Sequence, residues 1–347
     1  MDTNLMQKLE RIFNKTAGSN QIYEAVLFVQ NTGGDFSYSK GHGGRDIDSP
    51  LLMASITKLF TTSCILALQE QGRLSLDDGI AKYFDKAVLE GLHVYKGKEY
   101  SFALTISDLL FQVSGLPDVY EEGNNNAKNR VINEDFYLTF NESVEFAKKL
   151  NPHFAPHTMK RAHYADINFD MLGEILEKVM GLPLSEVYKK FIFEPVGLKN
   201  TYLPESENNF VPKIYYKDKA IHRPKFVMSS RASSGCVTTA RELMIFIKAF
   251  FGGELFDKLI FDRLSSYNKL QASMWPICYG GGYMRIPLNG VATFFRGKGE
   301  IKGHSGSTGS FAFYYPVKDL FFVGDLNQMA NAALPIKLSM RIAMTTI

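Results

Sequence analysis

The sequence lacks the features of a disulfide-stapled, zinc-ribbon or membrane-spanning protein. Its 347 residues include only three cysteines, Cys64, Cys236 and Cys278, which are widely separated and form no CxxC pair. This spacing predicts reduced, packed thiols. No apolar run approaches the roughly 18 residues of a membrane helix, and the first residues carry charges instead of an apolar signal segment. We therefore expect a cytoplasmic protein without a membrane span.

An excess of charge of one sign is also missing. Lys and Arg number 39 and Asp and Glu 36, which gives a formal net charge of +3, and the basic residues are scattered. Proteins that bind nucleic acid usually gather their basic residues on one face. No nucleic-acid partner is expected. Apolar residues make up 45% and charged residues 22% of the chain, which is ordinary globular usage.

Strand-like segments lie at both ends of the chain, and helix-like segments lie between them. EAVLFVQN (24–31) and DFSYSKG (35–41) follow an N-terminal amphipathic helix, and four further strand-like segments precede an apolar C-terminal helix: GGYMRIPL, VATFFRG, GSFAFYYP and LFFVGDL. No linker or repeat divides the chain. We expect one α+β domain over 1–347, an antiparallel sheet built from both termini and flanked by helices. Its sheet lobe would span about 1–54 and 270–347, and an inserted helical lobe about 55–269.

Helix signals are clear in the middle of the chain. SITKLFTTSCILALQEQ (55–71) is apolar on nearly every face and predicts a buried central helix. Two further helices are expected to begin with capping boxes, formed by Thr105 with Asp108 and by Thr239 with Glu242.

The central helix begins with a serine and a lysine three residues apart, Ser55 and Lys58. Positions i and i+3 share a helix face, so the two side chains can meet at the helix N-terminus. A serine hydroxyl becomes a nucleophile only when a neighbouring base takes its proton, and a lysine in an apolar site can be that base. The pair alone leaves two interpretations open: a catalytic pair, or a capping serine beside an outward-pointing lysine.

Two later segments add polar groups in the order expected of a penicillin-recognising site, an SxxK serine followed by two further short motifs. The first, HYADINFDMLGEILEKVMG, places Tyr164 just before a helix. The second, GHSGSTGSFAFYYP, places His304, Ser305 and Gly306 on a strand.

Several segments in register resemble the serine β-lactamase and penicillin-binding-protein superfamily, in the branch of class C β-lactamases, DD-peptidases, D-aminopeptidases and esterases. Besides the three motifs, the resemblance rests on TISDLLFQVSGLPD, on HFAPHTMKRAHYADINFDMLGEILEKVMG with FEPVGLKNTYL, and on SSGCVTTARELMIF. It covers about residues 22–325. It implies a β-lactamase-like fold and a metal-free serine hydrolase that needs no cofactor.

The resemblance also implies roles for single residues. Ser55 would be the acylated nucleophile and Lys58 its partner. Tyr164 would be the second general base and the proton donor to the leaving group, which a phenol near a lysine cation suits because its pKa would be lowered. The backbone N–H groups of Ser55 and Ser307 would form the oxyanion hole, and Ser305 and Gly306 would bind substrate.

Two positions depart from the family pattern. The second motif usually reads Y-x-N, but here Asp166 stands in place of the amide; it could bind substrate or only cap the helix that follows, a role open also to Asn168. The third motif usually carries lysine in penicillin-recognising enzymes, where this chain has His304, which could line the site or be structural. Both changes make the site less positive.

The expected substrate is therefore a small, neutral or cationic ester, amide or peptide. An esterase or amidase ranks first, a penicillin-binding DD-peptidase or weak β-lactamase second, and a non-catalytic binding protein on the same fold third. The oligomeric state is left open. A metal site is not expected: His153, His157 and His163 crowd one segment, but no acidic ligand is paired with them in the sequence, so they are interpreted as loop histidines.

Overall fold

The computed structural model describes residues 3–19, 21–158, 160–264 and 267–346. Its centre is an eight-stranded sheet in which every neighbouring pair is antiparallel. In spatial order the strands are β2 (Ser37–His42), β1 (Ala25–Asn31), β14 (Leu320–Asp325), β13 (Ser310–Tyr315), β12 (Glu300–Ser305), β11 (Tyr283–Pro287), β10 (Cys278–Gly280) and β9 (Asn268–Lys269). The N-terminal hairpin therefore pairs with the C-terminal strand. The predicted fold class, a sheet built from both termini, is confirmed.

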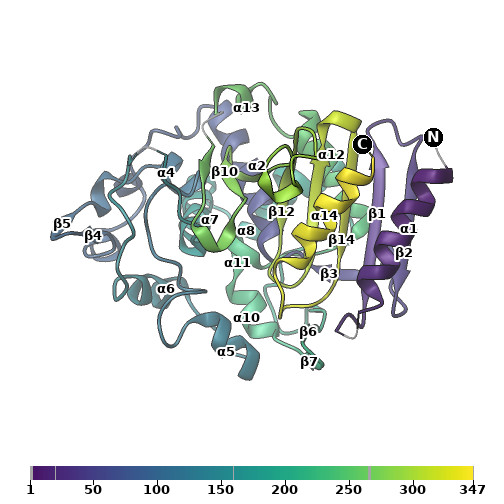
Figure 1. Ribbon diagram of the computed structural model, residues 1–347. Helices are drawn as coiled ribbons and strands as arrows, with labels where there is room; N and C mark the ends of the chain where they lie inside the picture. The colour runs from purple at the N-terminus through teal and green to yellow at the C-terminus, as the bar shows by residue number, and fades with distance from the viewer. Residues whose placement is uncertain (1–2, 20, 159, 265–266, 347) are drawn as a thin grey trace.

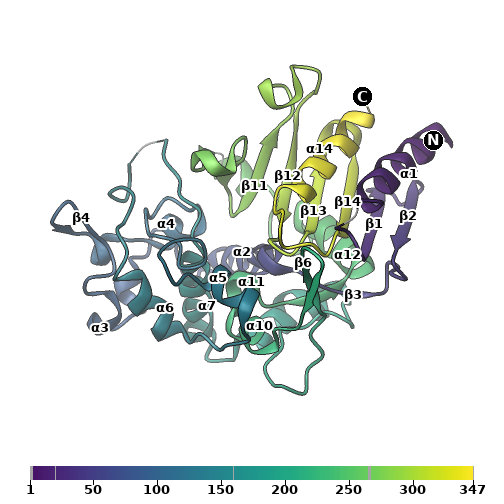
Figure 2. The same cartoon turned by 60° about the horizontal axis from the view of Figure 1, so that its bottom comes forward.

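Helices cover both faces of the sheet (Figures 1 and 2). The terminal helices α1 (Thr3–Ala17) and α14 (Leu334–Thr345) lie side by side on one face, and α12 (Ala240–Gly252) packs on β1, β13 and β14 on the other. All six residues of β14 are buried because this central strand is covered on both sides. α12 falls within the range expected for the helical lobe, yet it packs on the sheet.

Most of the remaining helices form a second lobe beside the sheet, which Figure 1 shows at the left and below. They are α2 (Thr57–Glu70), α3 (Lys86–Leu89), α4 (Ile106–Leu110), α5 (Ala127–Asn133), α6 (Phe140–Ala147), α7 (Asp166–Met180), α8 (Leu184–Tyr188), α9 (Glu194–Val196), α10 (Pro224–Ser229) and α11 (Arg231–Ser234). α13 (Ile260–Arg263) lies at the top of Figure 1, where Phe261 contacts Phe250 of α12 and Tyr283 of β11. Three two-stranded sheets lie apart from the main sheet: the long-range pair β3 (Pro50–Leu52) with β8 (Val237–Thr239), and the hairpins β4 (Val94–Tyr95) with β5 (Lys98–Glu99) and β6 (Ile214–Tyr216) with β7 (Lys219–Ile221).

Helix α2 runs through the middle of the molecule, between the sheet and α7. Residues 57–68 are all buried, as the apolar character of nearly every face predicts. Its buried polar side chains bond to neighbouring backbone; the Thr61 hydroxyl, for example, donates to Ala232 O at 2.8 Å. These bonds fix the N-terminal end of α2, which carries Lys58 and directly follows Ser55, at the junction of the two lobes.

Two local predictions are wrong in part. VATFFRG is not a strand, since Val291–Thr293 form a 3-10 turn and the following Phe294 has a left-handed backbone (φ 52°). At α12 the Thr239 hydroxyl accepts from Glu242 N as expected, but the Glu242 carboxylate does not return to the cap. It accepts instead from the backbone of Lys199 and Asn200. The box at Thr105 and Asp108 is confirmed.

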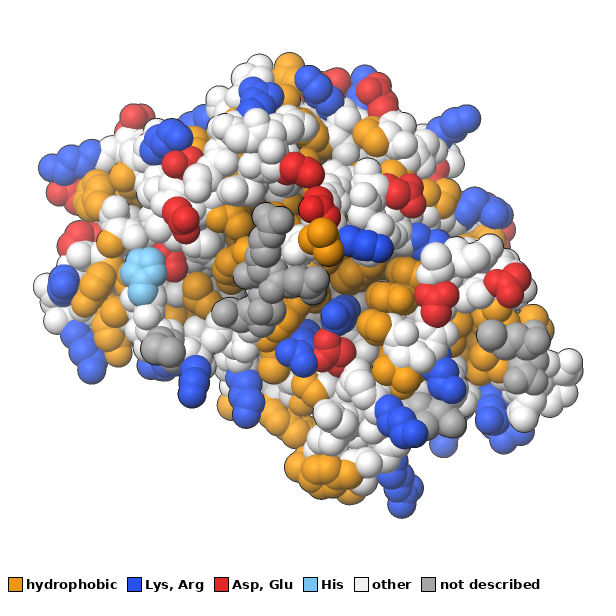
Figure 3. Space-filling view, turned by 90° about the horizontal axis from the view of Figure 1, so that it is seen from above, with side chains coloured by type: hydrophobic (Ala, Val, Ile, Leu, Met, Phe, Trp, Pro, Cys, Tyr) orange, Lys and Arg blue, Asp and Glu red, His pale blue; other side chains and the backbone are white. Residues whose placement is uncertain are grey.

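On the face in Figure 3, basic and acidic side chains are interspersed over the upper part, whereas Lys and Arg prevail along the lower edge. No helix among the described residues combines the length and the apolar character that a membrane crossing requires.

Candidate active site

Ser55 lies in a short 3-10 turn, Ala54–Ile56, that leads directly into α2. Ala54 has a positive φ of 44°, which is uncommon for a residue with a side chain and turns the chain sharply just before the serine. Lys58 follows one turn later, and its Nζ lies 3.4 Å from Ser55 Oγ. The expected meeting of the two side chains is therefore observed.

Lys58 is fully buried and held by two further partners. Its Nζ donates to Asp166 Oδ1 at 2.6 Å and to Ser233 O at 2.9 Å. It also lies 5.0 Å from the centre of the Tyr164 ring. A buried ammonium needs a counter-charge and hydrogen bonds to offset its lost hydration, and Asp166 with the Ser233 carbonyl supplies both.

Tyr164 precedes α7 and presents its ring to Lys58. The hydroxyl oxygen is buried and has no hydrogen-bond partner among the residues that the structure describes. Burial raises the pKa of Tyr164 well above its ordinary 10, and the Asp166 carboxylate adds to this, while the nearby Ser55 hydroxyl opposes it. The lowered pKa expected from a neighbouring lysine is therefore wrong, because burial disfavours the phenolate and the Asp166 charge disfavours it further.

Asp166 is not the helix cap that one interpretation allowed. It is the first residue of α7, the N-cap Ala165 provides no side-chain cap, and the carboxylate turns away to Lys58. The capping role belongs to Asp118, whose Oδ1 accepts from Asp166 N at 3.0 Å. Burial and the Asp166 charge raise the pKa of Asp118 well above its ordinary range.

His304 lies behind the site. It is fully buried on β12, with the rings of Tyr164 and Tyr279 each about 6 Å away between centres, at 6.0 and 5.9 Å. Burial, and then the charge of Lys58, lower its pKa to about 3, so the ring is neutral at ordinary pH. Nδ1 lies 2.8 Å from Ser305 O, which assigns the proton to that nitrogen. Of the two interpretations, the structural one describes its placement.

The turn from β12 to β13 lies against the start of α2. A Cβ on Gly306 would lie 2.7 Å from Met53 O and 2.8 Å from Ala54 Cβ, so only glycine lets the two segments approach this closely. The Ser310 hydroxyl donates to Met53 O at 2.8 Å and fixes the contact. Ser307, the next residue after Gly306, is thereby held near Ser55. The contact brings together the two segments whose N–H groups the resemblance assigns to the oxyanion hole.

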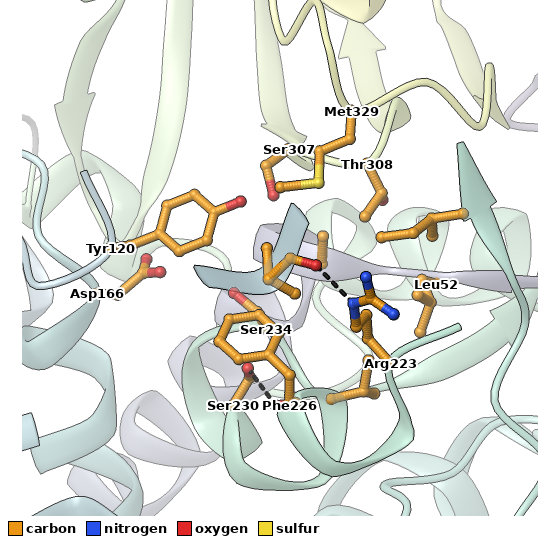
Figure 4. Close-up of a pocket in the computed structure, with 14 residues that line it drawn as sticks. Leu52, Tyr120, Asp166, Arg223, Phe226, Ser230, Ser234, Ser307, Thr308 and Met329 are labelled. Atoms are coloured by element: carbon orange, nitrogen blue, oxygen red, sulfur yellow. Dashed lines mark hydrogen bonds between the residues drawn. The ribbon is translucent and has the colours of Figure 1, made fainter. Parts of the chain in front are cut away.

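A cleft of about 620 Å³ opens over this constellation, and Ser55, Tyr164, Asp166, Ser305, Gly306 and Ser307 all line it. Its charged lining is mainly acidic: Asp118, Glu121, Glu122 and Asp166. Lys128 is the one Lys or Arg among the described lining residues, and it pairs with Glu121 at 2.9 Å. A smaller cavity of about 50 Å³ shares Tyr120, Asp166 and Ser307 with the cleft (Figure 4).

Glu122 changes the interpretation of the histidine-rich segment. Its carboxylate lies 3.0 Å from His153 Nε2 and 2.8 Å from His163 Nε2, so the premise that no acidic group accompanies these histidines is wrong. His157 lies elsewhere, with Nδ1 3.4 Å from Asp108.

Sequence reasoning missed Asp118, Glu122 and Ser233. Asp118 ends the SGLPD segment that carried part of the resemblance, so its acidic side chain was a usable signal. Ser233 binds Lys58 through its backbone carbonyl, which every residue type has, so its identity gave no signal. Glu122 is distant in the sequence from His153 and His163, and only the folded chain brings them into contact.

Comparison with known proteins identifies the family. The chain belongs to the Beta-lactamase family, whose model matches residues 9–344. It is 27% identical to Protein flp of Staphylococcus aureus over 244 residues; this match covers 65% of the chain but only 44% of that relative. Among solved structures, D-amino acid amidase from Ochrobactrum anthropi SV3 superposes with a TM-score of 0.78 at 18% identity, over 99% of this chain and 98% of the amidase. EstCE1, a hydrolase with promiscuous acyltransferase activity, gives 0.79 at 17% identity and 99% coverage of both chains. At these identities the structural matches establish the β-lactamase fold.

Proposed function

We propose that the protein is a serine hydrolase that forms an acyl-enzyme on Ser55 and acts on small esters or amides. The observation that carries the proposal is the contact between Lys58 Nζ and Ser55 Oγ at the base of the cleft. Burying an ammonium costs free energy that an apolar side chain in the same place would not cost. A buried lysine held 3.4 Å from a serine hydroxyl, beneath an open cleft, therefore points to a catalytic role.

The residues suggest the following sequence of proton transfers. Lys58 passes a proton to Asp166, 2.6 Å away, and the neutral amine then takes the proton of Ser55 as Oγ attacks the substrate carbonyl carbon. The N–H groups of Ser55 and Ser307 stabilise the oxyanion. Tyr164, kept protonated by its raised pKa, donates its proton to the leaving group. As a phenolate it then accepts a proton from the water that attacks the acyl-enzyme. Ser55 Oγ leaves the acyl carbon with a proton from Lys58, and Asp166 returns its proton to Lys58.

The acidic lining of the cleft supports a neutral or cationic acyl substrate. Asp166 is balanced by Lys58 and Glu121 by Lys128, and the raised pKa of Asp118 favours its neutral form, which leaves Glu122 as the charged lining carboxylate without a Lys or Arg ion pair among the described residues. An acyl group with an amine would be attracted to such a wall and one with a carboxylate repelled. The fold is shared with a D-amino acid amidase, so a substrate with a free amine is the amide to test first.

The test is a comparison of second-order acylation constants for a neutral p-nitrophenyl ester, an amino-acid amide and a penicillin. We expect turnover of the ester or the amide and slow or no acylation by the penicillin. Rapid, stable acylation by the penicillin would instead favour the penicillin-binding alternative. Absence of acylation by all three would support a non-catalytic protein.

A further inference from the structure

A cluster of Glu122, His153 and His163 lies in the same cleft and takes no part in the proposed proton transfers, although the charge of Glu122 belongs to the acidic wall proposed to attract an amine. Both imidazole Nε2 atoms point at one carboxylate: His153 Nε2 lies 3.0 Å from both Oε1 and Oε2, and His163 Nε2 lies 2.8 Å from Oε1. The three ligand atoms lie within 4.8 Å of one another. We propose that this cluster is a binding site for a divalent transition metal, Zn²⁺ in the first instance.

The donor set is the one that zinc takes in open, three-residue sites: two neutral imidazoles and one carboxylate. Tetrahedral bonds of about 2.0–2.1 Å place neighbouring ligand atoms about 3.3 Å apart. The distances from Glu122 oxygens to Nε2, 2.8–3.0 Å, need to lengthen only slightly to reach this spacing. The imidazole rings are stacked with centres 3.6 Å apart and planes 25° from parallel, so one ring must turn for both lone pairs to reach a common ion.

The cluster is fixed by the surrounding backbone. His163 N donates to Gln112 O at 2.9 Å and His153 N to Gly115 O at 2.8 Å, so one loop anchors both histidines. Asp118 N donates to Glu122 Oε1 at 2.8 Å and orients the carboxylate. Such outer contacts hold a ligand set before the metal arrives. To bind the metal through Nε2, each imidazole must carry its remaining proton on Nδ1.

The charge around the cluster also favours a cation. Within the described ranges no Lys or Arg forms an ion pair with Glu122; its charged-pair partners there are the two histidines. His163 is largely buried, whereas Glu122 and His153 are half-exposed and face the cleft, which leaves room for a water or a substrate atom at the fourth position. A bound Zn²⁺ would place two positive charges on this wall and oppose its attraction for an amine, so the proposed preference for a cationic acyl group applies to the protein without the metal.

The experiment measures Zn²⁺ binding to the whole chain, first stripped with a chelator, by competition with a chromophoric zinc indicator, together with the visible spectrum of bound Co²⁺. We expect one ion per chain and a tetrahedral Co²⁺ spectrum. Glu122→Gln keeps an oxygen for the histidine hydrogen bonds but removes the charge, and it should weaken binding on the order of 100-fold or more, since outer-shell partners alone contribute about 10–100-fold. His153→Ala should weaken it similarly.

His157→Ala is the matched control, because His157 lies in the same segment but outside the cluster. It should bind Zn²⁺ like the unmodified protein. The proposal is overturned if the unmodified protein takes up no Zn²⁺ with the folded state confirmed by its melting temperature, or if Glu122→Gln and His157→Ala bind equally well. Either result would make the cluster a hydrogen-bonded support for the loop. Zn²⁺ binding is measured without substrate, so failure here leaves the proposed hydrolase activity untouched.

Discussion

At the residue scale, the pairing of Lys58 with Asp166 is the feature that most distinguishes this site from the pattern of its family. An amide at position 166 could not neutralise a buried ammonium, whereas the carboxylate does so at 2.6 Å. The negative charge of Asp166 is then largely neutralised by Lys58 and acts less on a bound substrate. This weakens the sequence-based interpretation of Asp166 as a substrate-binding residue that repels anions, and it leaves that effect to Glu122, whose carboxylate lines the cleft without a Lys or Arg ion pair among the described residues.

The pairing predicts strong coupling between the two side chains. Asp166→Asn alone should destabilise the protein by about 3–5 kcal/mol, because it leaves an uncompensated buried charge. Adding Lys58→Met removes that charge, so the double variant should be more stable than the sum of the single effects by ~1–3 kcal/mol. Urea unfolding of the four proteins measures this coupling. Additive losses would show that the carboxylate and the ammonium do not interact.

Tyr164 offers a second test at this scale, since its hydroxyl is buried without a partner in the described part of the chain. Tyr164→Phe removes an unsatisfied polar atom, so the melting temperature should stay unchanged or rise slightly. The kcat for an ester should nevertheless fall by roughly 10²–10⁴-fold if the phenol transfers protons in the reaction. A variant with full kcat would remove Tyr164 from the mechanism and leave its ring as packing for Lys58.

At the scale of the elements, helix α7 carries two carboxylates four residues apart near its start, Asp166 and Asp170. Like charges at this spacing disfavour each other. The ion pair with Lys58 stabilises the charged form of Asp166 despite this repulsion. For Asp170, burial and then the Asp166 charge raise the pKa to about 7, against the effects of Ser233, Lys58 and Arg231.

This raised pKa predicts how stability depends on pH. The folded protein binds the Asp170 proton more tightly than the unfolded chain, whose carboxyl titrates near 3.8. The stabilising contribution of the Asp170 proton to the free energy of unfolding is therefore fully present below pH 3.8, and it is lost as the pH rises through about 7. Asp170→Asn should remove this loss, so the free energy of unfolding of the variant relative to the unmodified protein should increase between pH 5 and about pH 8. Asp77→Asn, an exposed site, is the control. Equal pH profiles for both variants would contradict the assignment.

The burial of each helix and strand explains which of them could be predicted from the sequence. The strands of the sheet and the buried helix α2 follow from regular alternation and from apolar faces, and both are confirmed. VATFFRG was misread because its apolar residues lie exposed: Phe294 and Phe295 are 82% and 71% exposed, so their hydrophobicity reflects no strand packing. Hydrophobic pattern predicts elements only where the side chains are buried.

At the scale of the whole molecule, the sequence predicts the convergence of Ser55, Lys58 and Tyr164, because three motifs occur in the order of a known family. It does not predict the pairing of Lys58 with Asp166, nor that of Glu122 with His153 and His163. These contacts join side chains 31 to 108 residues apart and depend on how α7 and two loops face α2. Spacing along the chain carries no information about such contacts.

The central claim is that Ser55 is the nucleophile, and intact mass spectrometry after treatment with a fluorophosphonate tests it most directly. The account predicts a single phosphonyl adduct per chain, located by peptide mapping on Ser55, and no adduct on the Ser55→Ala variant at an unchanged melting temperature. An adduct that persists in Ser55→Ala, for example on Ser305 in the same cleft, would contradict it.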